Sequence, residues 1–217
     1  MNDIKHLFYF FALSIFTWAC SKETVVTPAA TTSTGTTTTT PTPTVSASGF
    51  KLTSTAVVNG VLLDAFKCEK KVNGIENSIP LAWENAPAKA PSFAITMIHY
   101  PNSSDSTKYN SYLLLWGIDK TVNKILYAEA NKGPWFMGVN KDGNNISYTS
   151  PCSAGAGTHQ YILTIYALSE TPATLPTKST TAVTYEVLTK AISTVTVLDK
   201  AKLIFNSVTP TNCQKIG

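Results

Sequence analysis

A single histidine, His159, stands where a glycine-rich turn meets an apolar run. The stretch from Tyr148 to Leu168 reads YTSPCSAGAGTHQYILTIYAL. Binding residues are commonly placed on loops that a rigid scaffold holds, and an imidazole donates or accepts hydrogen bonds and changes charge near neutral pH. His159 is therefore the leading candidate for contact with a ligand. The alternative is a structural histidine that satisfies loop carbonyl groups.

The residues near His159 do not form a catalytic set in the sequence. A serine nucleophile needs a base and an orienting acid, and Ser150 and Ser153 have no acid in their own segment. A metal site needs three or four clustered ligands, which two histidines and scattered acids do not supply. We therefore predict no catalytic residues, no metal site and no cofactor. A hydrolase with His159 as its base is the less favoured hypothesis.

The charge of the chain argues against a nucleic-acid partner. All 17 basic residues are lysines, and the formal net charge is only +4. Arginine is the usual bidentate clamp for phosphate, and nucleic-acid-binding domains gather their basic residues into a dense patch. Neither feature is present in this sequence.

The N-terminus has the pattern of a targeting segment. Lys5 and His6 precede an apolar run that is short for a bilayer span and that ends at Ala19-Cys20. This end resembles the lipobox of bacterial lipoproteins, in which the cysteine is diacylated and becomes the first residue. We expect a lipoprotein signal peptide over residues 1–19 and a membrane anchor on Cys20; an ordinary signal peptide or an uncleaved anchor is the alternative. Residues 21–23 (SKE) resemble the export tag of surface lipoproteins in the Bacteroidetes.

The rest of the chain divides by composition. After Cys20, the segment to residue 48 is mostly Thr, Pro, Ala and Ser; such a composition cannot bury much apolar surface, so we expect an extended, disordered tether. Residues 49–208 form the predicted folded domain, and residues 209–217 a polar tail. The segments 92–99, 112–118 and 161–168 are rich in strand-forming apolar residues.

Turn residues separate these strand-like runs at frequent intervals, and this pattern predicts a mostly β domain. Two further strand-like runs lie at residues 50–54 and 57–63, and the run 112–118 is apolar throughout, as in a strand buried on both faces. We predict one helix over residues 185–193 and two closing strands at 195–197 and 201–205.

Several motifs in consistent order resemble the phosphatidylethanolamine-binding protein family, in its bacterial Raf-kinase-inhibitor-like branch. The block 79–87 (IPLAWENAP) resembles the family's Pro-x-Leu-x-Trp-x-x-x-Pro segment, and Gly138-Val139-Asn140 resembles its Gly-x-Asn. The stretch 148–168 resembles its Gly-Pro-Cys-Pro-Pro turn, its Gly-x-His-Arg-Tyr segment and its Tyr-Ala-Leu run, with Ser-Pro-Cys-Ser-Ala as the turn and Gln160 in place of the arginine. The resemblance covers roughly residues 50–205. It implies a sandwich in which a central antiparallel sheet packs on a smaller sheet, with one C-terminal helix and a small anion-accepting pocket.

The resemblance also implies which residues surround the pocket. His159 matches the family's pocket histidine and Tyr161 a wall position. The family's acidic ligand residue is replaced by His99, a second imidazole that would face His159, or by Tyr100 if the following proline sets the register. The alternative for His99 is a surface residue at a strand end. Tyr112 stands where the family has a pocket histidine. The predicted ligand-binding residues are thus His159, Tyr161, Pro151, Ser150, Ser153, Tyr112 and His99.

The cysteines fit an exported protein. If Cys20 carries lipid, three remain, and an odd count leaves one unpaired. On the family frame Cys68 and Cys152 both lie near the pocket end, so the resemblance implies a Cys68–Cys152 disulfide with Cys213 free. Cys68–Cys213 is the alternative.

These observations lead to one preferred function and two alternatives. The preferred hypothesis is a lipid-anchored binding protein of the outer membrane, periplasmic or surface-exposed, that holds a small anionic or polar ligand beside His159. A second hypothesis is an interaction or inhibitor module that contacts another envelope protein with the rim of a vestigial pocket.

Overall fold

The computed structural model describes residues 49–102, 104–143 and 145–210. The signal peptide, the lipid anchor on Cys20 and the linker up to residue 48 that the sequence predicts lie outside these residues, as does Cys213. No helix within the described ranges has the length and apolar character needed to cross a membrane.

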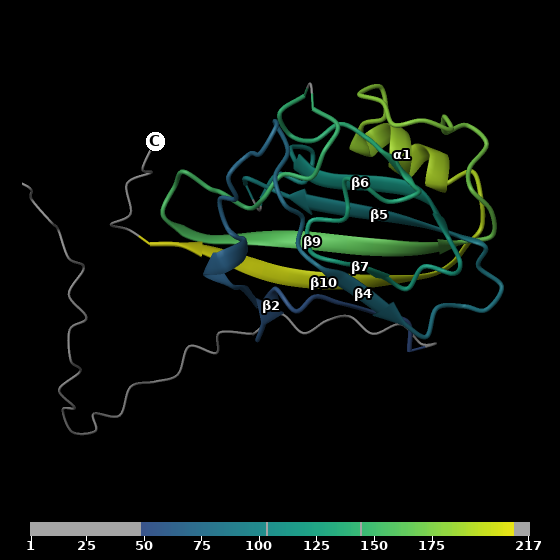
Figure 1. The fold of residues 1–217 in the computed structure, drawn as a ribbon, viewed down its shortest axis with the longest axis horizontal. Helices are drawn as coiled ribbons and strands as arrows, with labels where there is room; N and C mark the ends of the chain where they lie inside the picture. The colour runs from purple at the N-terminus through teal and green to yellow at the C-terminus, as the bar shows by residue number, and fades with distance from the viewer. Residues whose placement is uncertain (1–48, 103, 144, 211–217) are drawn as a thin grey trace, which may run out of the picture. The chain divides into compact units, whose positions relative to one another are not determined.

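A seven-stranded sheet forms the centre of the domain (Figure 1). Its order is β2-β3-β10-β9-β5-β6-β8, and its pairs are antiparallel except for β3 and β10, which run parallel. The strands of this sheet are β2 (Val57–Val58), β3 (Val61–Leu62), β5 (Ser92–His99), β6 (Asn110–Asp119), β8 (Phe136–Met137), β9 (Gly157–Leu168) and β10 (Val197–Thr209).

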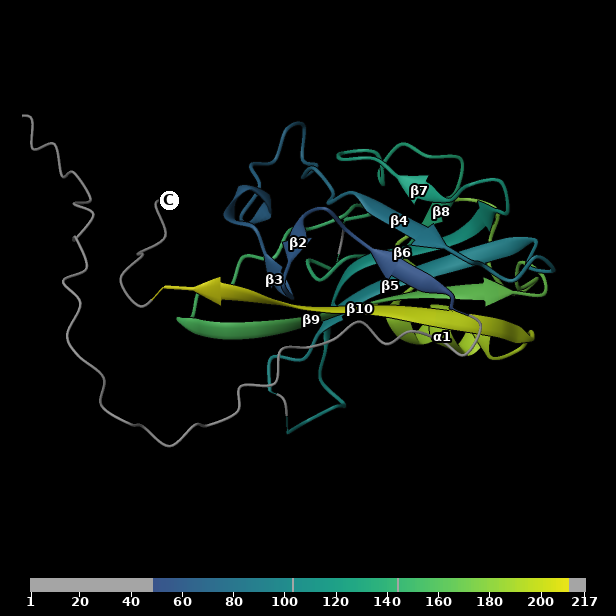
Figure 2. The ribbon, with the colours of Figure 1, turned by 90° about the horizontal axis from the view of Figure 1, so that it is seen from below.

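The smaller sheet packs on one face of the large one. It contains β1 (Lys51–Thr53), β4 (Leu81–Glu84) and β7 (Lys124–Ile125) in the order β1-β4-β7, and Figure 2 shows β4 and β7 above the large sheet. Apolar side chains from both sheets, including Leu52, Trp83 and Phe93, form the main core between them. A short 3-10 helix, η1 (Asp64–Phe66), follows β3.

Helix α1 (Tyr185–Ile192) covers the opposite face of the large sheet (Figure 2). Its Leu188 and Ile192 pack in a second core with Leu114 and Trp116 of β6, whereas Leu113 and Leu115 face the first core. Successive side chains of a strand point to opposite faces. Because each face of β6 is covered by one of the two cores, the central residues of β6 are apolar on both faces.

The predicted fold class is confirmed, and most predicted elements are present. The runs 92–99, 112–118 and 161–168 lie within β5, β6 and β9, and the predicted helix coincides with α1. Thr184 begins α1 as its N-cap, with its side chain accepting a hydrogen bond from the Val187 amide. The prediction of two separate closing strands was wrong, because residues 197–209 form one long strand, β10.

Candidate functional site

Three strands of the large sheet place the candidate site at one end of the domain. His99 is the last residue of β5, and it pairs with Asn110 at the start of β6 and with Tyr161 of β9. His159 lies two residues before Tyr161, where β9 continues past the end of β5. The strand register therefore brings together residues that lie up to 62 positions apart in the chain.

Stacked aromatic rings form the floor of the site. The His99 ring stacks on Tyr161, with ring centroids 4.9 Å apart and planes inclined by 23°, and Tyr161 stacks in turn on Phe205 of β10 at 5.5 Å. Tyr112 meets Tyr161 edge-on at 4.9 Å. Tyr161 is completely buried, so it supports the site from beneath rather than facing solvent.

The two imidazole rings are neighbours, 5.6 Å apart between centroids and inclined by 78°. Each ring is held by one main-chain carbonyl: His99 Nδ1 lies 2.8 Å from the Gln160 oxygen, and His159 Nε2 lies 2.9 Å from the Gly155 oxygen. A carbonyl only accepts, so each of these nitrogens carries a proton. A neutral His99 therefore leaves Nε2 as a hydrogen-bond acceptor.

Burial governs the protonation of the buried site residues. Desolvation of the His99 imidazole lowers its pKa, and the nearby His159 lowers it further, against the opposing effect of the Gln160 carbonyl. Burial and the adjacent Tyr161 raise the pKa of the Tyr112 hydroxyl well above its usual value. At neutral pH the site thus has a neutral His99 and a protonated Tyr112.

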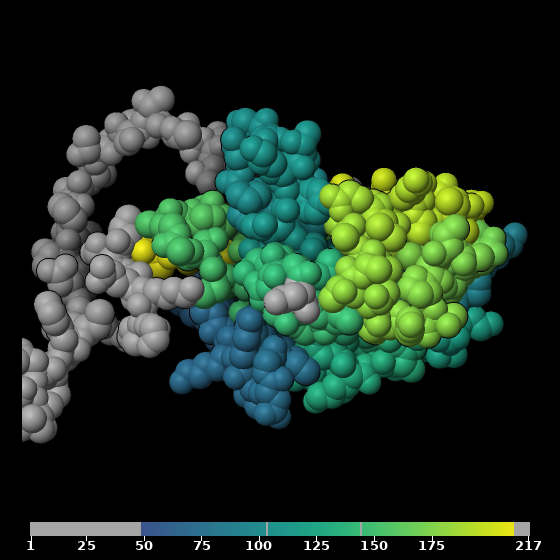
Figure 3. Space-filling model, turned by 90° about the horizontal axis from the view of Figure 1, so that it is seen from above, coloured from purple at the N-terminus to yellow at the C-terminus, as the bar shows by residue number. Residues whose placement is uncertain are grey.

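A cleft of about 280 Å³ lies over these rings, and we call it the histidine cleft. Figure 3 shows the segment that follows β5 beside the loops of residues 140–157 on this face. The cleft is lined by His99, Pro101, Asn110, Tyr112, Lys141, Cys152, Ser153, Ala154, Gly155 and His159.

Four of the seven predicted ligand-binding residues line the histidine cleft, namely His99, Tyr112, Ser153 and His159. The structure does not bring the other three to its surface. Tyr161 lies buried beneath His99, Pro151 lines a groove on the other side of the turn, and Ser150 lines a neighbouring cavity.

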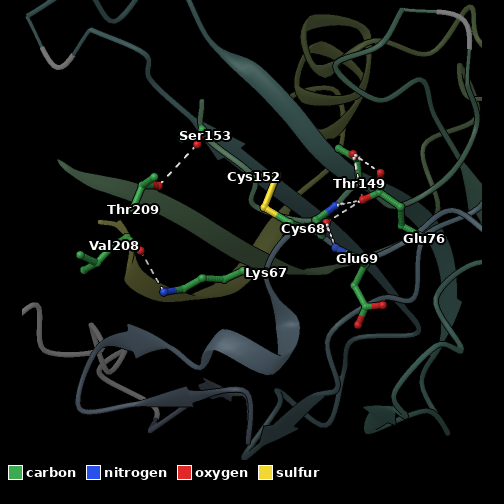
Figure 4. The surroundings of a disulfide bond; sticks show 10 residues. Lys67, Cys68, Glu69, Glu76, Thr149, Cys152, Ser153, Val208 and Thr209 are labelled. Carbon is green, nitrogen blue, oxygen red and sulfur yellow. Dashed lines mark hydrogen bonds between the residues drawn. A yellow bond between two sulfur atoms is a disulfide. The ribbon is translucent and has the colours of Figure 1, made fainter. Parts of the chain in front are cut away.

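Sequence reasoning missed Glu76, a carboxylate with only 8% of its surface exposed. Its Oε2 accepts hydrogen bonds from the Ser150 amide at 2.5 Å and the Ser150 hydroxyl at 2.7 Å, and the Thr149 hydroxyl donates to the same carboxylate. Figure 4 shows Glu76 reaching toward Thr149 beside the disulfide. No local sequence pattern indicates that Glu76 binds this turn. Glu76 lies in a polar segment, and its partners Thr149 and Ser150 are 73 and 74 residues away in the chain.

The cavity beside Glu76 holds about 580 Å³ and has charges of both signs. Asp142 lies 3.1 Å from the Lys71 ammonium and 3.0 Å from that of Lys141. These partners lower the pKa of Asp142, Lys141 more than Lys71, and Asp142 raises the pKa of Lys71. Lys141 also lines the histidine cleft, so it is the cationic side chain that the two cavities share.

A Cys68–Cys152 disulfide joins the segment before Glu76 to the turn that borders the cleft (Figure 4). Its Cα atoms are 4.7 Å apart. Main-chain contacts reinforce it, because the Cys68 amide donates to the Pro151 oxygen and the Glu69 amide to the Ser150 hydroxyl. This pairing is the one that the family resemblance implied. The described part of the chain contains no group of three or more His, Cys, Asp or Glu side chains able to hold a metal.

Comparisons with known proteins agree with this fold. The family model described as Phosphatidylethanolamine-binding protein matches residues 53–207. A solved phosphatidylethanolamine-binding protein homologue from Chlamydia trachomatis is similar with a TM-score of 0.59 and 21% identity, over 74% of this chain and 97% of that one. Escherichia coli YbcL, described as a member of the mammalian family, is similar with a TM-score of 0.59 and 16% identity, over 74% of this chain and 98% of that one. A search of curated proteins found no match.

Proposed function

The chain belongs to the phosphatidylethanolamine-binding protein family, and from this premise we propose that it binds a small anionic or polar ligand in the histidine cleft. The observation that carries the proposal is the paired arrangement of His99 and His159. Each ring uses one nitrogen on a main-chain carbonyl, which fixes its orientation and leaves the other nitrogen for a ligand.

The polar groups of the cleft define the ligand chemistry. Lys141 supplies a positive charge at the rim, while neutral His99 accepts a hydrogen bond through Nε2 and the Tyr112 hydroxyl is protonated. A ligand with one anionic group and one hydrogen-bond donor satisfies this set. An anion beside His99 favours the charged form of its imidazole, so binding of the anion is coupled to proton uptake by His99 and strengthens as the pH falls.

The contacts of Ser150 support binding rather than hydrolysis. Its hydroxyl donates to Glu76 and accepts from the Glu69 amide, so its described contacts are those of a structural link. A serine nucleophile would need a base in hydrogen-bond contact, commonly a histidine, and His159 instead contacts Gly155.

We also propose that the domain is tethered to a membrane of the cell envelope through lipid on Cys20. The support is the sequence alone: an apolar run that ends at Ala19-Cys20 and a Thr/Pro-rich segment up to residue 48. Radiolabelled fatty acid that enters the wild-type chain but not Cys20→Ala would establish the anchor. Labelling of both chains alike would contradict it.

Titration of the full chain tests the cleft. Phosphoethanolamine, inorganic phosphate and acetate are added separately while the histidine ring signals are followed by NMR. We expect saturable shifts of the His99 and His159 signals, loss of saturation in His159→Ala, and unchanged binding in the control Lys190→Ala on the distant helix α1. A flat response to all three probes, with the variants folded, would contradict the proposal.

Exposed apolar side chains favour a second candidate function, an interaction module for another envelope protein. Val58, Val61 and Leu63 on and beside the β2–β3 hairpin are 48%, 39% and 42% exposed, and Val208 at the end of β10 is 41% exposed. β3 pairs with β10, so these residues lie on neighbouring strands. Exposed apolar patches commonly mark protein contacts, and a flat titration of the cleft would favour this function.

A further inference from the structure

The cavity beside Glu76, about 580 Å³ in volume, contains charges that the described chain pairs only in part, and we call it the Glu76 cavity. It is a separate space from the histidine cleft, although Lys141 and Cys152 border both. Its walls are tied together by the Cys68–Cys152 disulfide and by the hydrogen bonds from Ser150 to Glu76. Preformed cavities of this size commonly bind small molecules.

The Glu76 carboxylate is a buried charge without a cation beside it. Only 8% of the residue is exposed, and no lysine in the described part of the chain forms an ion pair with it. Its hydrogen-bond donors belong to Thr149 and Ser150 and are all neutral. The Glu69 carboxylate points away from it (Figure 4) and accepts from the Tyr127 hydroxyl. Buried charges are normally paired, so the cavity offers Glu76 to a cationic group of a ligand.

The two oxygens of the Glu76 carboxylate are unequally used. Oε2 accepts from both the amide and the hydroxyl of Ser150. The Thr149 hydroxyl lies 3.3 Å from Oε2 and 3.4 Å from Oε1, and it has one proton to share between them. Among the described donors, Oε1 therefore receives only part of one long hydrogen bond. An ammonium group would give it a charge-assisted bond, which is shorter and stronger than a neutral one.

Positive charge gathers at another part of the same wall. Lys71 and Lys141 both donate to Asp142, at 3.1 and 3.0 Å, so two ammonium groups share one carboxylate. Each ammonium has three donors, and its described side-chain bond uses one of them. Asp142 raises the pKa of Lys71 most, and the charge of Glu76 also raises it, so Lys71 and Glu76 lie within electrostatic reach of each other.

We propose that the Glu76 cavity binds an amino acid, as a second site beside the histidine cleft. The ammonium group of the ligand donates to Glu76 Oε1, and its carboxylate accepts from Lys71 and Lys141. A ligand with only a positive charge meets the two lysines, and one with only a negative charge meets the buried carboxylate. The cavity therefore discriminates against both single-charge ligands by repulsion. This inference does not depend on the histidine cleft holding a ligand.

NMR titration of the full chain tests the proposal. Glycine, γ-aminobutyrate, ethylamine and acetate are added separately, and the Ser150 amide signal, whose proton is bonded to Glu76, is followed. We expect saturable shifts with glycine or γ-aminobutyrate, and a Kd about tenfold or more below those of ethylamine and acetate, because both charges of the amino acid are paired. The proposal is overturned if neither amino acid binds more tightly than ethylamine and acetate.

Two variants separate the two ends of the cavity. Lys71 is exposed, so Lys71→Gln should stay folded; it should weaken amino-acid binding about fivefold or more without weakening that of ethylamine. Glu76→Gln keeps a side-chain oxygen for Ser150 and should weaken the binding of amino acids and ethylamine alike. The matched control Lys132→Gln, a surface lysine paired with a glutamate of its own turn, should bind as the wild type does. Equal affinities of Lys71→Gln and Lys132→Gln would overturn the proposal.

His159→Ala distinguishes this site from the histidine cleft. His159 borders the histidine cleft and is not part of the Glu76 cavity. The Ser150 shifts caused by the amino acid should therefore persist with the same Kd in His159→Ala, even if the histidine cleft binds nothing. Loss of these shifts in the folded variant would place the amino acid in the histidine cleft and overturn the proposal.

Discussion

Glu76 and Ser150 lie 74 residues apart, yet one carboxylate oxygen of Glu76 accepts both the amide and the hydroxyl of Ser150. The disulfide joins the same two segments. The turn that borders the histidine cleft is therefore held by a charged hydrogen-bond network as well as by a covalent bond.

Replacement of Glu76 by alanine should destabilise the domain by about 2–4 kcal/mol, because it leaves the buried Ser150 amide without its charged acceptor. Urea denaturation of the full chain with the disulfide intact measures the loss. The matched control is Glu69→Ala in the same segment, whose carboxylate accepts from the exposed Tyr127 hydroxyl and which should cost less than about 1 kcal/mol. Equal losses would show that the network around Ser150 contributes little.

His99 should make stability depend on pH. Its pKa is lowered in the folded protein, so the unfolded chain takes up this proton at a higher pH than the native state. The resulting stability is fully present above about pH 6.5, the usual histidine value, and is lost as the pH falls through the lowered pKa. Urea midpoints between pH 8 and 5 should fall more steeply for the wild type than for His99→Gln, and parallel curves would contradict this assignment.

Removal of the disulfide should lower the free energy of unfolding by about 2–4 kcal/mol, because the bond closes a loop whose ends are 84 residues apart and so restricts the unfolded chain. The double variant Cys68→Ala/Cys152→Ala, compared with Cys213→Ala, isolates the effect by urea denaturation. Cys213→Ala should retain the wild-type midpoint. A double variant as stable as the wild type would mean that the hydrogen bonds alone hold the turn.

Tyr161 should tolerate loss of its hydroxyl but not of its ring. Tyr161→Phe keeps the stack between His99 and Phe205 and should change stability by less than about 1 kcal/mol, whereas Tyr161→Ala should cost about 3–5 kcal/mol. Thermal denaturation measures both. The His99 ring signal should move in the alanine variant, because its stacking partner is gone; an unmoved signal would argue against the stack.

Gly138 should not accept a side chain. A Cβ there would collide with the Val183 carbonyl oxygen and press on Leu114, and that carbonyl is fixed by a hydrogen bond from the Val139 amide. Gly138→Ala should therefore cost about 1–3 kcal/mol. Gly155→Ala, where a Cβ meets nothing within 4 Å, is the control and should leave the denaturation midpoint unchanged.

The fold could be predicted because apolar runs in the sequence mark most of the long strands. β5 and β6 are buried on both faces, so their central residues are nearly all apolar in the sequence, with Thr96 as a polar residue inside the run of β5. β10 was harder, because a register shift lies between Val197 and Asp199 and the polar pair Asp199-Lys200 interrupts the apolar pattern. The sequence therefore reads as two short strands where the structure has one.

The site could be predicted only in part. His99 and His159 were placed together through the order of the family motifs, and the structure places their rings 5.6 Å apart. Glu76 and Lys141 could not be found in this way. Both lie in polar turns, and their importance arises from contacts that only the folded chain creates.

The position of β10 has a consequence for the order in which the domain folds. This strand comes last in the sequence but lies third in the sheet, between β3 and β9. Until it emerges, the β2–β3 hairpin has nothing to attach to and β9 presents a bare edge. Because domains generally fold as units, the large sheet cannot be completed until β10 is available to pair with both of its neighbours.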